Sequence, residues 1–127
     1  MRALLVVDHS PRSDRAVTEF AERRWPPDTI VRVLAVVENV PPSAAELWFD
    51  AGGSLEAVLK ARKEKSEDLV ANIAGLLRAK GFTAETAVRH GRPRKTIAME
   101  AKAWLADVVV IGSRGLPAVK KSEGNTP

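Results

Sequence analysis

The chain of 127 residues carries 20 Lys and Arg against 16 Asp and Glu, for a formal net charge of +4, and it contains no cysteine. The lack of cysteine excludes disulfides, thiolate catalysis and cysteine-ligated metal sites. This length suits one domain that buries about two thirds of the surface exposed by its unfolded chain. Positive and negative residues are mixed, aromatic residues are few and no recognition motif occurs, which argues against nucleic-acid binding.

The N-terminus combines a short apolar run with an acid. Residues 3–7 read A-L-L-V-V, and Asp8 follows. The run is too short for a signal peptide or a membrane span, so we expect a cytoplasmic protein without a membrane partner. Its continuous apolar character predicts a buried strand that delivers Asp8 to the carboxyl edge of a sheet.

A helix is predicted next, near residues 14–24. Val17 and Phe20 recur at helical spacing, and Ser13 is the expected N-cap. Pro26, which follows this stretch, is expected to stop the helix.

A second buried strand is predicted at residues 30–37, which are apolar apart from Arg32. Glu38 follows this strand and places a second acid at the carboxyl edge of the sheet. Residues 40–54 then hold two prolines and two glycines around Leu47-Trp48-Phe49. We expect a long loop with one helical turn, which serves as a lid or contacts a partner.

The following stretch predicts a long helix and a third strand. Apolar residues from Leu55 to Leu77 mark one helical face. Lys80-Gly81-Phe82 matches a glycine C-cap closed by a hydrophobic residue. Residues 83–89 alternate between apolar and polar side chains and are less apolar than the first two strands, which predicts a strand nearer the edge of the sheet.

The last predicted helix and strand complete the pattern. Pro93 suits the first turn of a helix that carries Ile97 and Trp104 on its apolar face. Residues 108–111 are V-V-V-I, which predicts a strand buried on both sides. Strands separated by helices imply parallel pairing, so the fold class is α/β with an open, doubly wound, Rossmann-like parallel sheet.

The loop after this strand, Gly112-Ser113-Arg114-Gly115, is the first candidate for a site. Its two glycines permit a tight turn and let backbone N–H groups approach a ligand. Ligands of open α/β sheets bind beyond the carboxyl ends of the strands. The spacing of the two glycines alone also fits a loop that only turns the chain and binds no ligand.

Several motifs taken together resemble the universal stress protein family. They are L-L-V-V-D-H-S, V-L-A-V-V-E, the H-G-R-P turn and A-D-V-V-V-I-G-S-R-G. The resemblance covers residues 1–116 and implies an adenine nucleotide α-hydrolase-like domain that forms homodimers and takes part in the stress response. One subclass of the family binds ATP at the strand ends, so the resemblance implies ATP as the ligand.

The resemblance also implies roles for five residues. Asp8 matches the acid that contacts the adenosine part of the nucleotide, and Val36 matches the apolar residue beside the adenine. Ile111, Gly112 and Gly115 match the start of the phosphate loop. Such a loop stabilises phosphate through backbone N–H groups and a helix N-terminus.

The C-terminus departs from the family pattern. The phosphate loop continues with nine residues, a glycine and a hydroxyl residue, but here that position holds Asn125-Thr126, and Gly124 comes one residue early. The family's fourth helix and fifth strand are expected to be missing, with residues 117–127 as a flexible tail. The strand at 108–111 would then be an apolar edge, open to pairing with another chain.

These departures leave two further functions open. One is an interaction protein that acts as a homodimer, or on a partner protein, without nucleotide. The other is an enzyme related to the ATP pyrophosphatases, which would need a pyrophosphate loop that H-S-P-R-S-D does not supply. No catalytic motif occurs, so we do not expect an enzyme.

The remaining polar residues carry weaker signals. His9 and His90 lack metal-ligand spacing, and we predict no metal site. Arg92, Arg94 and Lys95 lie at the start of the last helix, where they either neutralise phosphate or form a solvated face.

Overall fold

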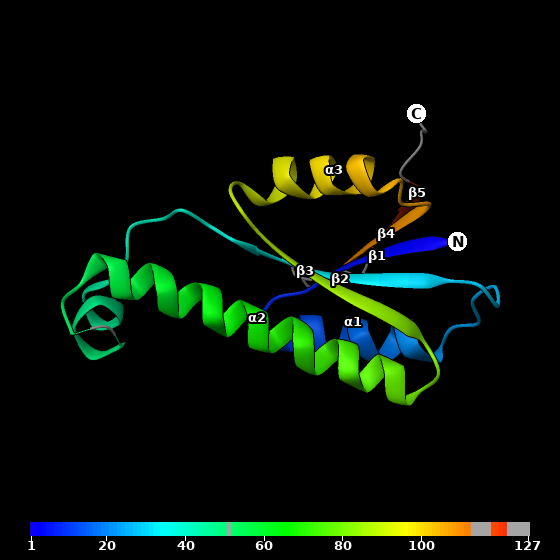
Figure 1. The fold of residues 1–127 in the computed structure, drawn as a ribbon, viewed down its shortest axis with the longest axis horizontal. Helices are drawn as coiled ribbons and strands as arrows, with labels where there is room; N and C mark the ends of the chain where they lie inside the picture. Colours follow the sequence, from blue (N-terminus) through cyan, green and yellow to red (C-terminus); the bar gives the residue numbers. More distant parts are fainter. Residues whose placement is uncertain (51, 113–117, 122–127) are drawn as a thin grey trace.

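The structure is a computed structural model that describes residues 1–50, 52–112 and 118–121. The elements follow in the order β1 (Arg2–Val6), α1 (Pro11–Glu22), β2 (Ile30–Val37), the π-helical turn η1 (Glu46–Asp50), α2 (Leu55–Ala79), β3 (Thr83–His90), α3 (Pro93–Trp104), β4 (Val108–Ile111) and β5 (Ala118–Lys121) (Figure 1). No helix in these ranges combines the length and the apolar character needed to cross a membrane.

The strands form one sheet in the order β3-β2-β1-β4-β5. The pairs β1–β2, β1–β4 and β2–β3 are parallel, which confirms the predicted α/β class. Val6, near the end of β1, is in register with Leu34 of β2 and Ile111 of β4. The carboxyl ends of these strands therefore meet at one edge of the sheet, and β3 lies at the outside as expected.

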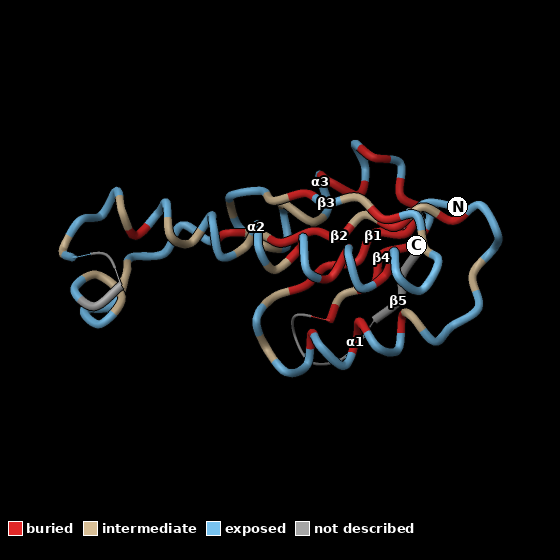
Figure 2. Tube along the Cα trace, turned by 60° about the horizontal axis from the view of Figure 1, so that its bottom comes forward, coloured by how far each residue is buried: buried red, intermediate tan, exposed pale blue. Residues whose placement is uncertain are grey.

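Helices cover both faces of the sheet (Figure 1). On one face, Phe20 of α1 and Leu77 of α2 belong to a buried cluster with Leu5 and Val33. On the other, Trp104 of α3 packs in a second cluster on the opposite sides of the same strands. Figure 2 shows that the buried residues follow the strands, while the beginning of α2 is largely exposed. The sheet is thus buried on both sides, as its continuous apolar strands require.

Helix α1 begins earlier than the sequence predicts. Its N-cap is Ser10, whose Oγ accepts a hydrogen bond from the backbone N–H of Ser13, and Pro11 occupies the first helical position. The predicted N-cap, Ser13, lies inside the helix instead, where its buried hydroxyl accepts a 3.0 Å hydrogen bond from the backbone N–H of Asp8. Proline fits the first turn because it needs no N–H partner there.

The end of α2 follows the predicted glycine C-cap. Gly81 adopts a φ of 97°, a left-handed conformation that suits glycine. The N–H of Phe82 donates to the carbonyl of Leu77 over 3.0 Å, and that of Gly81 donates to the carbonyl of Arg78. This arrangement satisfies the last helical carbonyls and turns Phe82 onto the core, where it packs against Phe20.

The C-terminal segment corrects the expectation that no fifth strand exists. Ala118–Lys121, expected within a flexible tail, form β5 and pair antiparallel with β4. β4 is therefore an inner strand, and β5 takes its place at the sheet edge. Unpaired backbone groups at the edge of β4 favour such pairing. Positions 117 and 122–127 of the expected tail lie outside the described residues, and the domain boundary at 116 stays a prediction.

Candidate functional site

An open cleft of about 450 Å³ lies over the carboxyl ends of β1 and β2. Residues at the ends of these strands line it, together with residues near the N-terminal ends of α1 and α3. The lining residues are Val6, Val7, Asp8, Arg12, Val36, Glu38, Pro93 and Ile97. The topology explains the position, because α1 and α3 leave the sheet on opposite faces, and the loops that lead into them separate there.

Asp8 follows β1 directly and is held by two hydrogen bonds. Its Oδ1 accepts a 2.8 Å hydrogen bond from the N–H of Ser10, and its own N–H donates to Ser13 Oγ. The first is an Asx turn, which leads the chain from the strand into α1. Asp8 therefore lies at the carboxyl edge of the sheet, where it lines the cleft, and its hydrogen bonds give it a local structural role.

Val36 supplies part of an apolar wall. It is half-buried near the end of β2 and, like Ile97 of α3, packs against the second core cluster. Both residues, with Pro93, line the cleft. The predicted pair Asp8 and Val36 thus shares one cavity, which combines a carboxylate with apolar surface.

Ile111 and Gly112 lie beside the cleft but not among its lining residues. Ile111 is the register partner of Val6, and the N–H of Gly112 donates to the carbonyl of Val6 over 3.2 Å. A Cβ on Gly112 would overlap the Cβ of Ala16 in α1, so the close approach of helix and strand requires glycine here. This packing explains Gly112 without a ligand. Gly115, the other predicted glycine, lies outside the described residues.

The structure adds Arg12 to the site and supports the inclusion of Glu38. Arg12 is exposed on the first turn of α1 and lines the cleft, although its position in the sequence carried no sign of this. Glu38 reaches the cleft from the end of β2, as its place after a strand predicts. The predicted basic cluster behaves differently: Arg92, Arg94 and Lys95 do not line the cleft.

Arg62 of α2 anchors the long loop that leaves the cleft at Glu38. Its guanidinium pairs with both carboxylate oxygens of Glu46, at 2.7 and 2.8 Å. Its Nη1 also donates to the carbonyls of Glu38 and Val40. The hydrogen bond from Arg62 holds the pKa of Glu46 below its ordinary value and raises the pKa of Arg62. This pair fixes the course of the loop next to the cleft.

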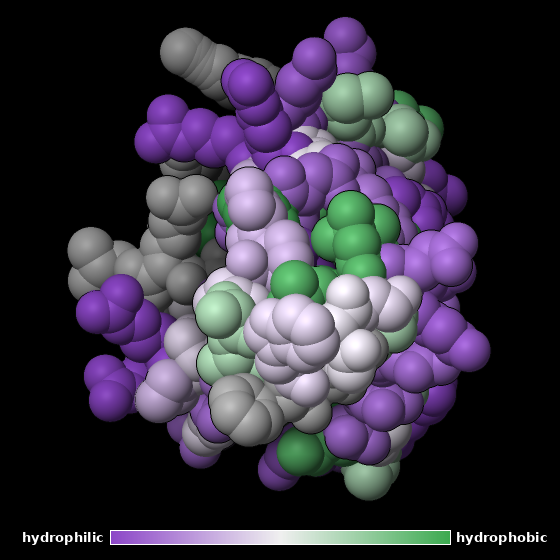
Figure 3. All heavy atoms as spheres, turned by 90° about the vertical axis from the view of Figure 1, so that its left-hand side faces the viewer, coloured by the Kyte–Doolittle hydropathy of each residue, from purple (hydrophilic) through white to green (hydrophobic). Residues whose placement is uncertain are grey.

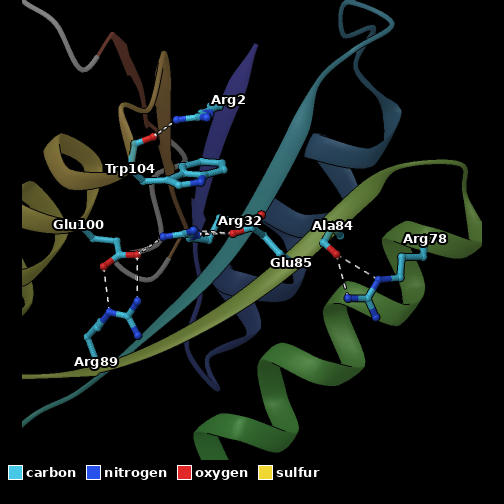
Figure 4. A network of polar contacts seen from close by, with 8 residues as sticks. All are labelled: Arg2, Arg32, Arg78, Ala84, Glu85, Arg89, Glu100 and Trp104. Atoms are coloured by element: carbon cyan, nitrogen blue, oxygen red, sulfur yellow. Dashed lines mark hydrogen bonds and ion pairs between the residues drawn. The ribbon is translucent and has the colours of Figure 1, made fainter.

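A second polar network lies between α3 and the strands β2 and β3, and none of its residues lines the cleft (Figure 4). Glu100, which is 8% exposed, accepts hydrogen bonds from Arg32 over 2.6 Å and from Arg89 over 2.9 Å. Arg32 also pairs with Glu85 and lies 4.6 Å from the ring centroid of Trp104. The network connects α3 to β2 and β3, and it explains the isolated arginine in the apolar strand β2.

Within the described ranges, no group of three or more metal-ligating side chains could hold a metal ion. The polar part of the cleft consists of Asp8, Glu38 and Arg12. Such a set suits hydrogen bonds to hydroxyl groups and an ion pair with an anion.

Comparisons with known proteins agree with the motifs in the sequence. The model of the universal stress protein family matches residues 1–122. A search of curated proteins found no match.

Solved structures share the fold. The chain is similar to universal stress protein UspA from Lactobacillus plantarum, with 22% identity, a TM-score of 0.67 and coverage of 87% of this chain and 75% of that one. It is similar to a family protein from Arabidopsis thaliana with AMP bound, with 21% identity, a TM-score of 0.63 and coverage of 100% and 89%. A universal stress protein in complex with cAMP gives 18% identity, a TM-score of 0.51 and coverage of 86% and 73%. Because the family model spans nearly the whole sequence, the chain belongs to the universal stress protein family.

Proposed function

We propose that this protein binds an adenine nucleotide in the cleft over β1 and β2. The observation that carries the proposal is the combination of a fixed carboxylate, Asp8, with an apolar wall that includes Val36 and Ile97. An adenosine group needs both, because its ribose hydroxyls donate hydrogen bonds and its base offers flat apolar faces. The volume of about 450 Å³ falls in the range of small-molecule sites.

Two structural neighbours support adenine nucleotides as the ligand class, since one is described with AMP bound and another in complex with cAMP. In the proposed complex, Asp8 accepts hydrogen bonds from the ribose and Val36 packs on the adenine. The phosphate-side roles of Ile111, Gly112 and Gly115 rest on the family resemblance alone. ATP, which the family resemblance implies, shares the same adenosine part.

The proposed role is one of binding, without a catalytic step. We place the protein in the cytoplasm, where it takes part in the stress response in a nucleotide-bound and a nucleotide-free form. Loop 38–54 starts at the cleft and is anchored by Arg62, so a bound nucleotide next to Glu38 would contact the segment that leads to the surface of η1.

Isothermal titration calorimetry with AMP, ATP and GMP tests the proposal. We expect saturable binding of the adenine nucleotides and weaker binding of GMP. Asp8→Ala is expected to reduce the affinity about tenfold, because it removes a charged hydrogen-bond acceptor. Asp8→Asn keeps an oxygen for the Ser10 N–H and separates loss of charge from loss of the turn.

Asp28→Ala is the matched control, because Asp28 is exposed in the loop between α1 and β2, away from the cleft. It should bind nucleotide like the wild type. The proposal is wrong if the folded wild-type protein gives no saturable binding, or if Asp8→Ala and Asp28→Ala bind equally well. Thermal melts of each variant establish that it is folded.

A second candidate function, self-association without nucleotide, is favoured by the end of the molecule formed by η1 and the start of α2. Trp48, Leu55 and Leu59 are 65%, 56% and 43% exposed there. Figure 3 faces this end and shows green and near-white atoms gathered at its centre, with purple atoms around much of the rim. Exposed apolar side chains in one region are typical of interaction surfaces.

We propose a second copy of the chain as the partner of this surface, because the adjoining turns of α2 carry both Glu56 and Lys60, which can pair across a two-fold axis. Sedimentation velocity tests this candidate. A dimer that dissociates in Trp48→Ser but persists in Met99→Ser, a change at an exposed apolar residue of α3, would support it. A wild-type protein that stays monomeric at high micromolar concentration would exclude it.

A further inference from the structure

We propose that Arg12 makes the cleft selective for a nucleotide with a single phosphate, so that the protein binds AMP more tightly than ATP. This inference rests on the proposed function and names the ligand of that site more closely. It depends on the charges that line the cleft and on the direction of the chain after β4.

Arg12 is placed to receive a phosphate group. It is the second residue of α1, its side chain is exposed, and it lines the cleft. It forms no ion pair with any residue in the described part of the chain. A guanidinium can donate two parallel hydrogen bonds to one phosphate, and the N-terminal end of α1 adds a favourable partial charge.

The other charged residues of the cleft suit the ribose rather than further phosphates. Oδ1 of Asp8 accepts the N–H of Ser10, while Oδ2 accepts no hydrogen bond from a described residue and can take one from a hydroxyl. Glu38 offers a second carboxylate on the same cleft. Hydroxyl groups donate to carboxylates, whereas phosphate oxygens are repelled by them.

The charge balance limits the number of phosphates. Among the described residues of the lining, Arg12 alone is basic, against the two acids Asp8 and Glu38. One phosphate can pair with Arg12 and stay away from both carboxylates. Each additional phosphate brings more negative charge without another described cation of the lining to compensate it, so the electrostatic energy of binding becomes less favourable.

The path of β5 supports the same limit. Ala118 pairs with Ile111 at the carboxyl end of β4, and Lys121 pairs with Val108 at the opposite end. Residues 118–121 therefore lead away from the cleft. Because they are held in antiparallel pairing along β4, their backbone does not wrap around a chain of phosphates at the cleft.

Calorimetric titrations with adenosine, AMP and ATP, each without added metal, test the inference on the full chain. The wild-type protein should bind AMP about tenfold more tightly than adenosine, the effect of one charged hydrogen-bonded pair, and more tightly than ATP. Arg12→Gln should bring the AMP affinity down to about that of adenosine, with a much smaller effect on adenosine itself. Arg15→Gln, an exposed arginine of the same helix that does not line the cleft, is the matched control and should keep the preference for AMP.

The possible outcomes separate this inference from the proposed function. Tighter binding of ATP than of AMP would overturn the inference and leave nucleotide binding intact. The inference is likewise overturned if Arg114→Gln, and not Arg12→Gln, removes the difference between AMP and adenosine. If the folded protein binds none of the three compounds, both the inference and the proposed function are wrong.

Discussion

Gly112 at the end of β4 and Ala16 in α1 approach so closely that a Cβ on the glycine would overlap the Cβ of the alanine. The atom in the way belongs to a short, rigid side chain on a buried helix face, so it cannot rotate aside. Gly112 therefore sets the distance between the central strands and α1, and with it the position of Arg12 at the start of that helix.

Gly112→Ala should lower the free energy of unfolding by about 1–3 kcal/mol, because the added methyl group overpacks the contact with Ala16. Gly75→Ala is the matched control: Gly75 lies inside α2, and a Cβ there meets no atom within 4 Å. That substitution should raise stability by about 0.5–1 kcal/mol, since alanine favours the helix. Chemical denaturation measures both. Equal effects of the two substitutions would contradict the packing role of Gly112.

Glu100→Ala should lower the free energy of unfolding by about 2–3 kcal/mol, because it removes the buried acid that accepts hydrogen bonds from both Arg32 and Arg89. Glu85→Ala removes the other partner of Arg32 but affects a side chain that is 44% exposed. Its expected cost is below about 1 kcal/mol. Urea denaturation of the two variants, compared at the same pH, distinguishes them. Similar losses would show that Glu100 does not act as a buried partner for the two arginines.

The pair Glu46–Arg62 predicts a pH-dependent contribution to stability. Glu46 has an ordinary pKa of 4.5, and the hydrogen bond from Arg62 lowers that pKa in the folded protein. A lowered pKa means that folding favours the ionised form. The contribution is therefore fully present above the ordinary pKa and is lost as the pH falls through the folded value.

Melting temperatures of the wild type and Glu46→Gln, recorded from pH 7 down to about pH 3, test this direction. The difference between the two proteins should be largest near neutral pH and should shrink below pH 4.5. Glu56→Gln, at an exposed acid in the first turn of α2, is the control for a general effect of lost charge. A difference that does not vary over this range would show that the ion pair does not stabilise the folded loop.

Most of the fold could be predicted from the sequence because its strands are continuously apolar. The four β-branched residues 108–111 and the run 30–37 have the bounds that the pattern indicated. The start of α1 was predicted wrongly, since Ser10 and Ser13 are both good N-caps and the presence of Pro11 between them decides which one is used. β5 was missed because A-V-K-K has neither alternation nor an apolar run, and its pairing depends on the edge that β4 offers.

The site was predictable only in part, for a similar reason. Asp8 and Glu38 follow apolar strands directly, so the topology alone brings them to one edge. Arg12 lies on a helix, and which of its faces turns toward the cleft depends on how α1 packs on the sheet through Ala16 and Phe20. A local pattern does not contain that information.

Binding of an adenine nucleotide in the cleft is tested most directly by ¹H–¹⁵N NMR mapping with AMP. Titration should shift the backbone amides of lining residues such as Val7, Asp8, Arg12 and Val36. The chemical shifts of amides at the opposite edge of the sheet, where the strands begin, such as those of Thr29 and Phe82, should stay unchanged. A folded protein whose spectrum does not respond to AMP, or responds only at that opposite edge, would contradict binding in the cleft.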